Sequence, residues 1–324
     1  MARRALGPAT LQVVQAVEAV LAGPALVACS GGPDSLALAA AASLVSSRRG
    51  LAVRAAVVDH GLQPGSAGVA ADVAGRVALL GLPTAVLTVT VRGGGDGPEA
   101  SARHARYAAL EAEAAGEPVL LGHTLDDQAE TVLLGLARGS GARSLAGMPR
   151  RRGPFVRPLL GLRAATTREA CAELGLDPWL DPHNGEERFA RVRVRERVLP
   201  VLEAELGPGI AEALARSAGL LRADAELLDV LAGEALATRT GEELDCGWLA
   251  ALPEALRARV LRDWLRAAGA TDLAATHLES VAALVTAWHG QRWAEAPGVR
   301  VHRTGGRLRV SPSRTGADEV VAAE

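Results

Sequence analysis

Short apolar runs alternate with longer helical patterns along the first part of the chain. The strand-like runs lie at residues 25–29, 51–59, 84–91 and 118–123, and the helical patterns lie at 35–47, 66–81, 99–115 and 126–138. Strands that are apolar on both faces and separated by helices are typical of a parallel sheet covered on both sides. The pattern therefore predicts an α/β fold with a doubly wound parallel sheet, in which ligands bind beyond the carboxyl ends of the strands.

A different pattern follows residue 138. A long arginine-rich helix is expected at 186–205, and Pro208-Gly209 then interrupts the chain. Beyond this break the sequence is helical until a hairpin-like segment at 299–310. We therefore expect two domains, one at residues 1–210 and a smaller, mainly helical one with a terminal hairpin at 211–324.

The N-terminal segment combines two arginines with an apolar stretch, as secretion signals do. Gln12, Gln15 and Glu18 interrupt this stretch at helical spacing, which favours an amphipathic helix with Thr10 as its N-cap. No apolar run reaches ~18 residues, so no membrane span is expected and a cytoplasmic location is predicted.

Composition excludes several classes of protein. The 324 residues carry a formal net charge of -2, so any affinity for nucleic acid has to be local. All 35 basic residues are arginine, which excludes the lysine-bearing P-loop and Schiff-base enzymes. Cys29, Cys171 and Cys246 are far apart in the sequence, so no zinc ribbon or redox pair is expected and a reducing compartment fits.

The segment SGGPDS follows the first strand and opens the next helix. Its glycines allow the backbone to close tightly on a ligand, and the amides of the first helical turn can bind an anion. An acid in this position suits a phosphate site if Mg²⁺ lies between the carboxylate and the phosphate oxygens. A plain strand–turn–helix corner is the alternative, but we favour a pyrophosphate site with Asp34 as the magnesium ligand. The predicted phosphate-binding residues in this loop are Ser30, Gly31, Gly32, Pro33, Asp34 and Ser35.

This loop resembles the PP-loop of the N-type ATP pyrophosphatases, which adenylate a substrate oxygen. Within that superfamily, the other motifs resemble those of the tRNA(Ile)-lysidine synthases. They are VVDHGLQ (57–63), ARHARY (102–107), GHTLDDQAETVLLGLARGSG (122–141), RPLL (157–160), DPHN (181–184) and RVRVR (191–195). His183 and Val192 depart from the family pattern, which has serine and asparagine there.

The resemblance implies a reaction that uses ATP, Mg²⁺, free L-lysine and the minor isoleucine tRNA with a CAU anticodon. ATP activates the wobble cytidine, and the ε-amino group of lysine then attacks the base and releases AMP. The product is lysidine, which changes decoding from AUG to AUA. The sequence carries no signal for the oligomeric state, and a homodimer stays open.

Several residues at other strand ends are candidates for this site. Asp59 and His60 are expected beside the adenosine, although a simple strand-end turn is the alternative. The resemblance implies that Arg103 contacts the ATP phosphates; otherwise Arg103 and Arg106 would form a solvated face paired with Glu111.

The segment from His123 to Glu130 opens a helix with three acids. Asp127 and Glu130 lie on one helix face and could bind the lysine ammonium and help to deprotonate it, with Asp126 and His123 beside them. Part of the pattern is also explained by capping, with Thr124 as N-cap and Asp127 as its capping-box partner. A zinc site is disfavoured because no further metal-ligand motif accompanies it.

Two basic segments are candidates for tRNA binding. Residues 131–168 contain eight arginines and no acid, and a second arginine cluster lies at 188–197. Arginine runs are often only solvated surface, but two of them beside an ATP site favour contact with a phosphate backbone. The predicted tRNA-binding residues are Arg138, Arg143, Arg157, Arg191, Arg193 and Arg195.

Two other functions share the ATP-binding loop. A tRNA 2-thiolating enzyme would need paired cysteines, which this chain lacks. A non-catalytic ATP-binding regulator would need the loop but neither the acids at Asp127 and Glu130 nor the arginines.

Overall fold

The computed structural model describes residues 6–61, 65–90, 98–139, 141–179 and 188–313. The chain forms two compact units, Met1–Leu221 and Arg222–Glu324. The proposed boundary near residue 210 coincides with the start of the long helix α10 (Ile210–Ala237), which continues past Leu221.

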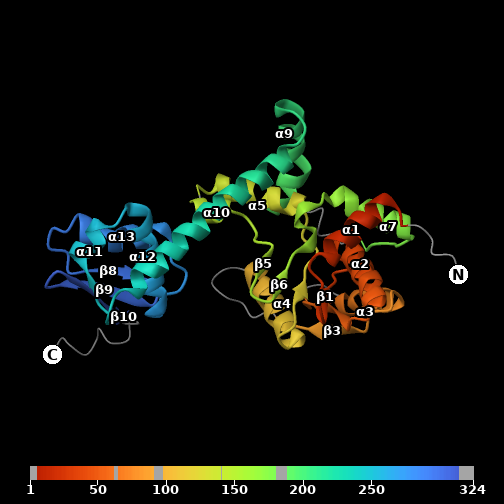
Figure 1. Ribbon diagram of the computed structural model, residues 1–324, viewed down its shortest axis with the longest axis horizontal. Helices are drawn as coiled ribbons and strands as arrows, with labels where there is room; N and C mark the ends of the chain where they lie inside the picture. The colour runs from red at the N-terminus through yellow and green to blue at the C-terminus, as the bar shows by residue number, and fades with distance from the viewer. Residues whose placement is uncertain (1–5, 62–64, 91–97, 140, 180–187, 314–324) are drawn as a thin grey trace. The chain divides into compact units, whose positions relative to one another are not determined.

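The first unit contains a six-stranded sheet in the order β3-β2-β1-β4-β6-β5 (Figure 1). All neighbouring strands pair in parallel except β5 and β6. This confirms the predicted doubly wound parallel sheet. The strands are β1 (Ala25–Ala28), β2 (Val53–Asp59), β3 (Thr84–Thr88), β4 (Val119–Leu120), β5 (Arg151–Arg152) and β6 (Phe155–Val156).

Successive residues of the central strands point into two different cores. Val27 packs with the helices on one face of the sheet, whereas its neighbour Leu26 packs with Leu110 and Phe155 on the other face. One face is covered by α1 (Pro8–Glu18), α2 (Pro33–Arg49), α3 (Ser66–Leu79) and α7 (Ala164–Leu174), and the other by α4 (Pro98–Ala114). The central strands β1 and β4, which are buried on both faces, are entirely apolar, as their sequence indicated.

The N-terminal helix is present, but the prediction of Thr10 as its N-cap is wrong. Helix α1 begins at Pro8 with Gly7 as N-cap, and Thr10 lies inside its first turn. The Glu173 carboxylate caps the helix instead, accepting hydrogen bonds from the backbone nitrogens of Ala9 and Thr10 (3.1 and 2.8 Å) and from the Thr10 hydroxyl (2.6 Å). A residue distant in sequence thus satisfies the free amides of the first turn.

The arginine-rich segment is helical over its described part, although not as one regular α-helix. It comprises α8 (Ala190–Arg193), a π-helical turn (Val194–Val198) and α9 (Leu199–Leu206). Pro200 follows the π-helical turn. Proline has no backbone N–H to donate, and it commonly disturbs the helical hydrogen bonds that precede it. The remaining elements of this unit are α5 (Leu125–Ala137), α6 (Ala142–Leu145) and the 3₁₀ turn η1 (Pro158–Gly161).

The second unit packs helices against a four-stranded antiparallel sheet in the order β7-β10-β9-β8. Its buried core includes Leu261, Leu265, Val301 and Leu308. The expected hairpin is formed by β9 and β10, and two strands that we did not predict extend it. The elements are β7 (Leu244–Asp245), α11 (Cys246–Ala251), α12 (Glu254–Ala267), α13 (Ala275–Thr286), β8 (Trp293–Ala296), β9 (Val299–Thr304) and β10 (Arg307–Pro312). Over the described residues of both units, we find no helix with the length and apolar character that a membrane crossing requires.

The cap on α1 predicts a pH-dependent change in stability. Its hydrogen bonds lower the pKa of Glu173, so the carboxylate stabilises the fold above the ordinary pKa of glutamate and this contribution is lost as the pH falls. We expect Glu173→Ala to lower Tm by a few degrees at pH 7, with the difference from wild type shrinking below about pH 4. Thermal unfolding across this pH range would measure it, and an equal difference at every pH would contradict the capping role.

Candidate functional site

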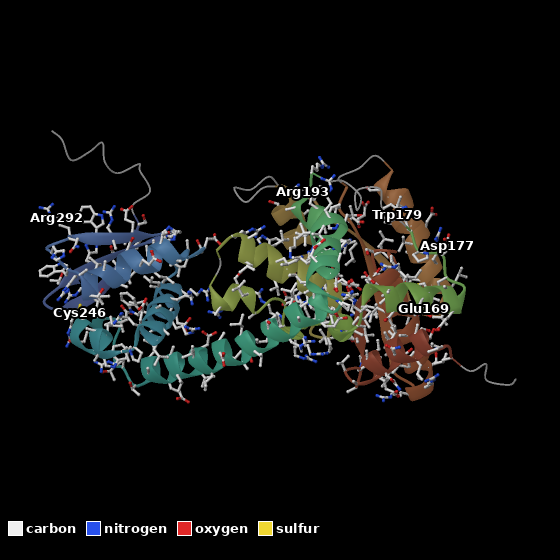
Figure 2. All side chains as sticks on the ribbon, turned by 90° about the horizontal axis from the view of Figure 1, so that it is seen from above. Glu169, Asp177, Trp179, Arg193, Cys246 and Arg292 are labelled. Atoms are coloured by element: carbon white, nitrogen blue, oxygen red, sulfur yellow. The ribbon has the colours of Figure 1, made fainter. Side chains whose placement is uncertain are left out.

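The SGGPDS loop joins the carboxyl end of β1 to the first turn of α2. Gly31 adopts a left-handed conformation (φ 85°), and a Cβ atom there would lie 2.5 Å from Val73 Cγ2. The Gly31 carbonyl accepts a hydrogen bond from the backbone nitrogen of Trp179 (3.0 Å), a residue that follows α7 (Figure 2). Only glycine fits this turn, which packs tightly on α3 and on the segment after α7.

The N-terminus of α2 is open to an anion. Its N-cap, Gly32, has no side chain, and no side-chain oxygen among the described residues caps this end of the helix. The Ser35 hydroxyl closes the loop from within, accepting from the Ser30 nitrogen and donating to the Gly32 carbonyl (both 3.1 Å). The uncapped first-turn amides and the helix dipole therefore favour a phosphate at this position.

Gly122, at the end of β4, also allows close packing here. A Cβ atom at this position would lie 3.0 Å from backbone atoms of Asp34 and Ser35. The end of β4 therefore lies directly against the first turn of α2. This packing holds together the residues that follow β1 and β4.

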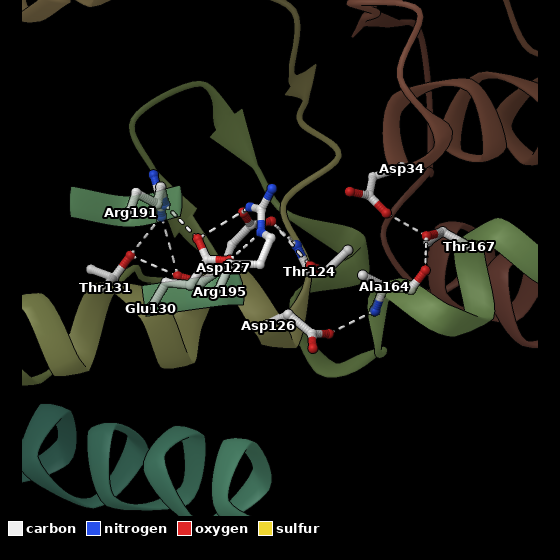
Figure 3. A network of polar contacts seen from close by, with 10 residues as sticks. All are labelled: Asp34, Thr124, Asp126, Asp127, Glu130, Thr131, Ala164, Thr167, Arg191 and Arg195. Carbon is white, nitrogen blue, oxygen red and sulfur yellow. Dashed lines mark hydrogen bonds and ion pairs between the residues drawn. The ribbon is translucent and has the colours of Figure 1, made fainter. Parts of the chain in front are cut away.

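Asp34 lies in this first turn and faces the helix α7. Its Oδ1 accepts a hydrogen bond from the Thr167 hydroxyl (Figure 3). Burial raises the pKa of the Asp34 carboxyl to about 6; the Thr167 hydrogen bond opposes this shift and the nearby Asp127 carboxylate adds to it. A half-buried carboxylate with a second one near it suits a bound cation, so these residues fit Mg²⁺ carried with ATP.

Asp126 and Asp127 are both engaged in the first turn of α5. Asp127 Oδ2 accepts from the nitrogen (2.8 Å) and hydroxyl (3.0 Å) of Thr124, so the capping box is formed. Asp126 Oδ2 accepts from the Ala164 nitrogen (2.7 Å), and its Oδ1 lies 3.3 Å from Arg163. Asp127 Oδ1 makes a looser contact, 3.7 Å from Arg195 Nη2.

Glu130 is fully buried and holds two arginines (Figure 3). Its Oε2 accepts from Arg191 Nε and its Oε1 from Arg195 Nε, each at 2.7 Å. Arg191 also donates to the Thr131 hydroxyl (2.9 Å) and Arg195 to Glu130 Oε2 (3.2 Å). Glu130, which we predicted to bind lysine, is thus paired with Arg191 and Arg195, which we predicted to bind tRNA.

Two histidines, His60 and His123, follow strand ends. Burial lowers the pKa of His123 to about 3 and also lowers that of His60. The Nδ1 atom of each is buried and has no hydrogen-bond partner among the described residues. Asp59, beside His60, accepts a hydrogen bond from the Gly61 nitrogen (3.0 Å).

The other predicted arginines differ widely in exposure. Arg138, Arg143 and Arg193 are exposed. Arg157 is only 4% exposed and donates to the Pro149 carbonyl (2.9 Å). Arg103 donates to the Tyr107 hydroxyl (3.2 Å). Asp181, His183 and Asn184 of the DPHN motif lie outside the described residues.

Sequence reasoning missed Thr167 and Arg163. Thr167 binds Asp34 and is fully buried, and Arg163 contacts Asp126 and also Glu203 and Glu212. Neither belongs to a motif that we singled out. In the sequence, the only sign of them was that two polar residues lie beside an apolar helical pattern.

Comparisons with known proteins agree with this arrangement. A family model described as a PP-loop domain matches residues 9–202, and one described as a TilS substrate binding domain matches residues 244–309. The chain is 52% identical to the tRNA(Ile)-lysidine synthase of Leifsonia xyli subsp. xyli (strain CTCB07), over 89% of each chain. It is 57% identical to the protein of that name from Mycolicibacterium paratuberculosis (strain ATCC BAA-968 / K-10), over 82% of this chain and 81% of the relative.

A solved structure resembles the fold. The U34-tRNA thiolase NcsA from Methanococcus maripaludis with its [4Fe-4S] cluster superposes with a TM-score of 0.51 at 18% identity. The match covers 66% of this chain and 78% of that one. At this identity, the likeness concerns the fold alone.

The raised pKa of the half-buried Asp34 predicts that removing its charge stabilises the ligand-free protein. Because its pKa is raised, its contribution to stability is fully present below the ordinary pKa of aspartate and is lost as the pH rises through about 6. Asp34→Asn keeps the acceptor for Thr167 and should therefore raise the unfolding free energy by about 1–2 kcal/mol at pH 8 in buffer without divalent cations. At pH 4 the two proteins should be alike. Denaturant unfolding at both pH values measures this, and an Asn variant less stable at pH 8 would contradict it.

Proposed function

The chain belongs to the tRNA(Ile)-lysidine synthase family of ATP-dependent tRNA-modifying ligases, in agreement with the function that its motifs predicted. On this basis, we propose that it joins free L-lysine to the wobble cytidine of tRNA(Ile) with a CAU anticodon. One observation carries the proposal: the open N-terminus of α2, the half-buried Asp34 and the charged cluster of α5 meet at the carboxyl edge of one sheet. ATP and tRNA as substrates suit the cytoplasm, where we place the activity.

In this proposal, the SGGPDS loop binds the ATP phosphates through backbone amides. Asp34, together with the phosphate oxygens, would hold Mg²⁺, which supplies positive charge where negative charge accumulates. Asp59 and His60 lie at the end of the neighbouring strand β2, where we place the adenosine.

Adenylation and amine attack follow in order. An oxygen of the cytosine displaces pyrophosphate from the α-phosphate of ATP, and the lysine ε-amine then attacks the ring carbon and expels AMP. Only the neutral amine is a nucleophile, so a group must take up its proton. Asp127 Oδ1 suits this role, since the other oxygen is held by Thr124 and Oδ1 has only the 3.7 Å contact with Arg195.

We assign Glu130 a positioning role beside the amine. Both of its oxygens are occupied by arginines, so the ammonium group of lysine would meet Asp127 first. Glu130 instead fixes Arg191 and Arg195 next to Asp127. His123 interacts electrostatically with Asp127, but it is neutral and therefore adds no positive charge beside this carboxylate.

Exposed basic residues supply the proposed tRNA contacts. In the first unit these are Arg138, Arg143 and Arg193, with Arg191 and Arg195 turned toward Glu130. In the second unit, the strand register places Trp293, His302 and Arg309 in one row on the solvent-facing side of the sheet. Arg300 lies 4.7 Å from the Trp293 ring centroid. A tryptophan with a guanidinium beside a basic row suits stacking and phosphate contact with RNA.

An assay with labelled lysine tests the activity. We expect transfer of radiolabelled lysine into unmodified isoleucine tRNA with a CAU anticodon, with AMP released only when ATP, tRNA and lysine are all present. Asp34→Ala should lower the rate about a hundred-fold or more, because the cation loses its protein ligand. Asp127→Asn should instead lose lysine transfer while pyrophosphate release with tRNA continues. Absence of label in the tRNA with the wild-type protein would refute the proposal.

A matched pair of variants tests the surface of the second unit. Arg300 and Arg239 each stack on a tryptophan, but Arg239 lies over Trp248, which does not belong to the exposed row. If Arg300 contacts a phosphate, Arg300→Gln should reduce the slope of log K against log salt concentration for tRNA binding by about 0.7–0.9. Arg239→Gln should leave the slope unchanged. Filter binding at several salt concentrations measures both, and equal slopes for the two variants would exclude this surface.

A further inference from the structure

The first turn of α7 contacts both groups of acids at the site (Figure 3). Its Thr167 hydroxyl donates a hydrogen bond to Asp34 Oδ1, in the first turn of α2. Its Ala164 nitrogen donates to Asp126 Oδ2, in the first turn of α5 (2.7 Å). These partners lie 133 and 38 residues away in the sequence. One helical turn therefore joins the loop that we assign to the ATP phosphates to the acids that we assign to the amine.

Helices α5 and α7 begin against each other. The Leu125 nitrogen, at the first residue of α5, donates to the Leu162 carbonyl that precedes α7 (2.8 Å). The Ala164 nitrogen, at the first residue of α7, donates to Asp126 of α5. First-turn amides have no partner within their own helix, so each helix here satisfies one such amide of the other. The start of α5 is thereby fixed relative to α7.

Arg163, the N-cap of α7, holds Asp126 from a second direction. Its Nη1 lies 3.3 Å from Asp126 Oδ1. Its Nη2 and Nε lie 3.7 and 3.4 Å from carboxylate oxygens of Glu203 and Glu212. Glu203 in turn accepts a hydrogen bond from the Ile210 nitrogen, at the first residue of α10 (3.2 Å). Single ion pairs of a partly exposed arginine contribute little, but three that point to different helices fix the position of its guanidinium group. Arg163 therefore ties Asp126 to α9 and α10.

Thr167 is held equally firmly. Its side chain is fully buried, and its hydroxyl also lies 2.8 Å from the Ala164 carbonyl of the same helix. Threonine is branched at Cβ, which restricts its χ1 rotamers. One turn further along α7, Ala170 and Cys171 pack in the hydrophobic core with α1 and α2. The Asp34 carboxylate thus meets a donor whose position is set by α7.

We propose that the first turn of α7, together with its N-cap, is a positioning element for both halves of the reaction. Thr167 orients the Asp34 carboxylate. Arg163 orients Asp126 and with it the turn that carries Asp127. Both are positioning residues, because they contact the acids and not the reacting groups. Hydrogen-bond partners of a metal-binding carboxylate strongly affect metal affinity, and small misplacements of a reacting group lower the rate. The roles of Asp34 and Asp127 rest on the proposed function, whereas the two contacts do not.

Binding measurements on the full-length protein test the Thr167 contact. Thr167→Val removes the hydroxyl but keeps the shape of the side chain, whereas Thr167→Ser keeps the hydroxyl. Calorimetric titration with ATP in excess Mg²⁺ should give about tenfold weaker binding for Thr167→Val, because Asp34 loses the partner that orients it. Titration with ATP in EDTA should show no such difference, and Thr167→Ser should recover most of the affinity.

Thr10→Val is the matched control. Thr10 is another buried threonine whose hydroxyl donates to a carboxylate, that of Glu173, outside the site. This variant should bind ATP like wild type under both conditions. For Thr167→Val, wild-type affinity in Mg²⁺, or an equal loss of affinity with and without Mg²⁺, would overturn the role of Thr167.

Kinetics test the Arg163 contact. Arg163→Gln should raise the KM for lysine about tenfold, since the turn that carries Asp127 is less well held. Pyrophosphate release with tRNA and ATP should stay near the wild-type rate. Arg163→Lys, which keeps a charge beside Asp126, should restore part of the effect on KM. Arg49→Gln is the control, because Arg49 has a similar exposure and joins α2 to α1 through Glu18. An equal change in both steps would overturn the role of Arg163.

Hydrogen exchange of the ligand-free protein keeps this test separate from the proposed function. In Arg163→Gln, the amides of residues 122–128 should exchange faster than in wild type, and in Arg49→Gln they should not. Unchanged exchange in folded Arg163→Gln would overturn the positioning of α5, whether or not lysine is transferred. Absence of lysine transfer by the wild type would instead refute the proposed function alone. The Tm of each variant checks folding, and Thr167→Ala takes the place of Thr167→Val if the latter unfolds.

Discussion

The arrangement of the first unit's site depends on the buried carboxylate of Glu130. It has no exposed surface, and Arg191 and Arg195 supply its hydrogen-bond partners there by donating to both of its oxygens. Removing one partner of such a buried pair costs about 3–5 kcal/mol, and the partial exposure of both arginines lowers this figure. The interaction fastens the arginine-rich segment to α5. In doing so, it places positive charge beside Asp127, the residue that we expect to meet the amine.

Charge is balanced differently at the three parts of this edge of the sheet. Around Glu130, acids and bases are paired within the protein. At Asp34, a half-buried carboxylate lies near another acid, and around Tyr107 three guanidinium groups form no ion pair with a carboxylate of the described residues. The two unbalanced places have opposite sign, as expected for a protein that binds a cation together with polyanionic substrates. Charges are therefore paired within the protein where side chains are held in a fixed geometry. They are unpaired where we expect a ligand of opposite charge.

Local patterns were enough to predict the sheet and the phosphate loop. The apolar runs around Val27 and Val57 and the glycines of SGGPDS act through neighbours in the sequence. Contacts between distant residues could not be read in this way. Thr167 and Asp34 are 133 residues apart, and Glu130 and Arg195 are 65 apart. Strands of two residues, such as β5 and β7, are too short to show any alternation.

The predicted arginines illustrate the same limit. Their number, and for residues 131–168 the absence of acids, indicated RNA contact for all of them alike. The fold instead buries Arg157, pairs Arg191 and Arg195 with an acid and leaves Arg138 exposed. The spacing of Arg191 and Arg195 has one more implication. They reach one carboxylate because they lie about one helical turn apart, and inserting a single residue between them would rotate one by about 100°. This short segment should therefore be conserved in length among relatives even where its intervening side chains, such as Val192, vary.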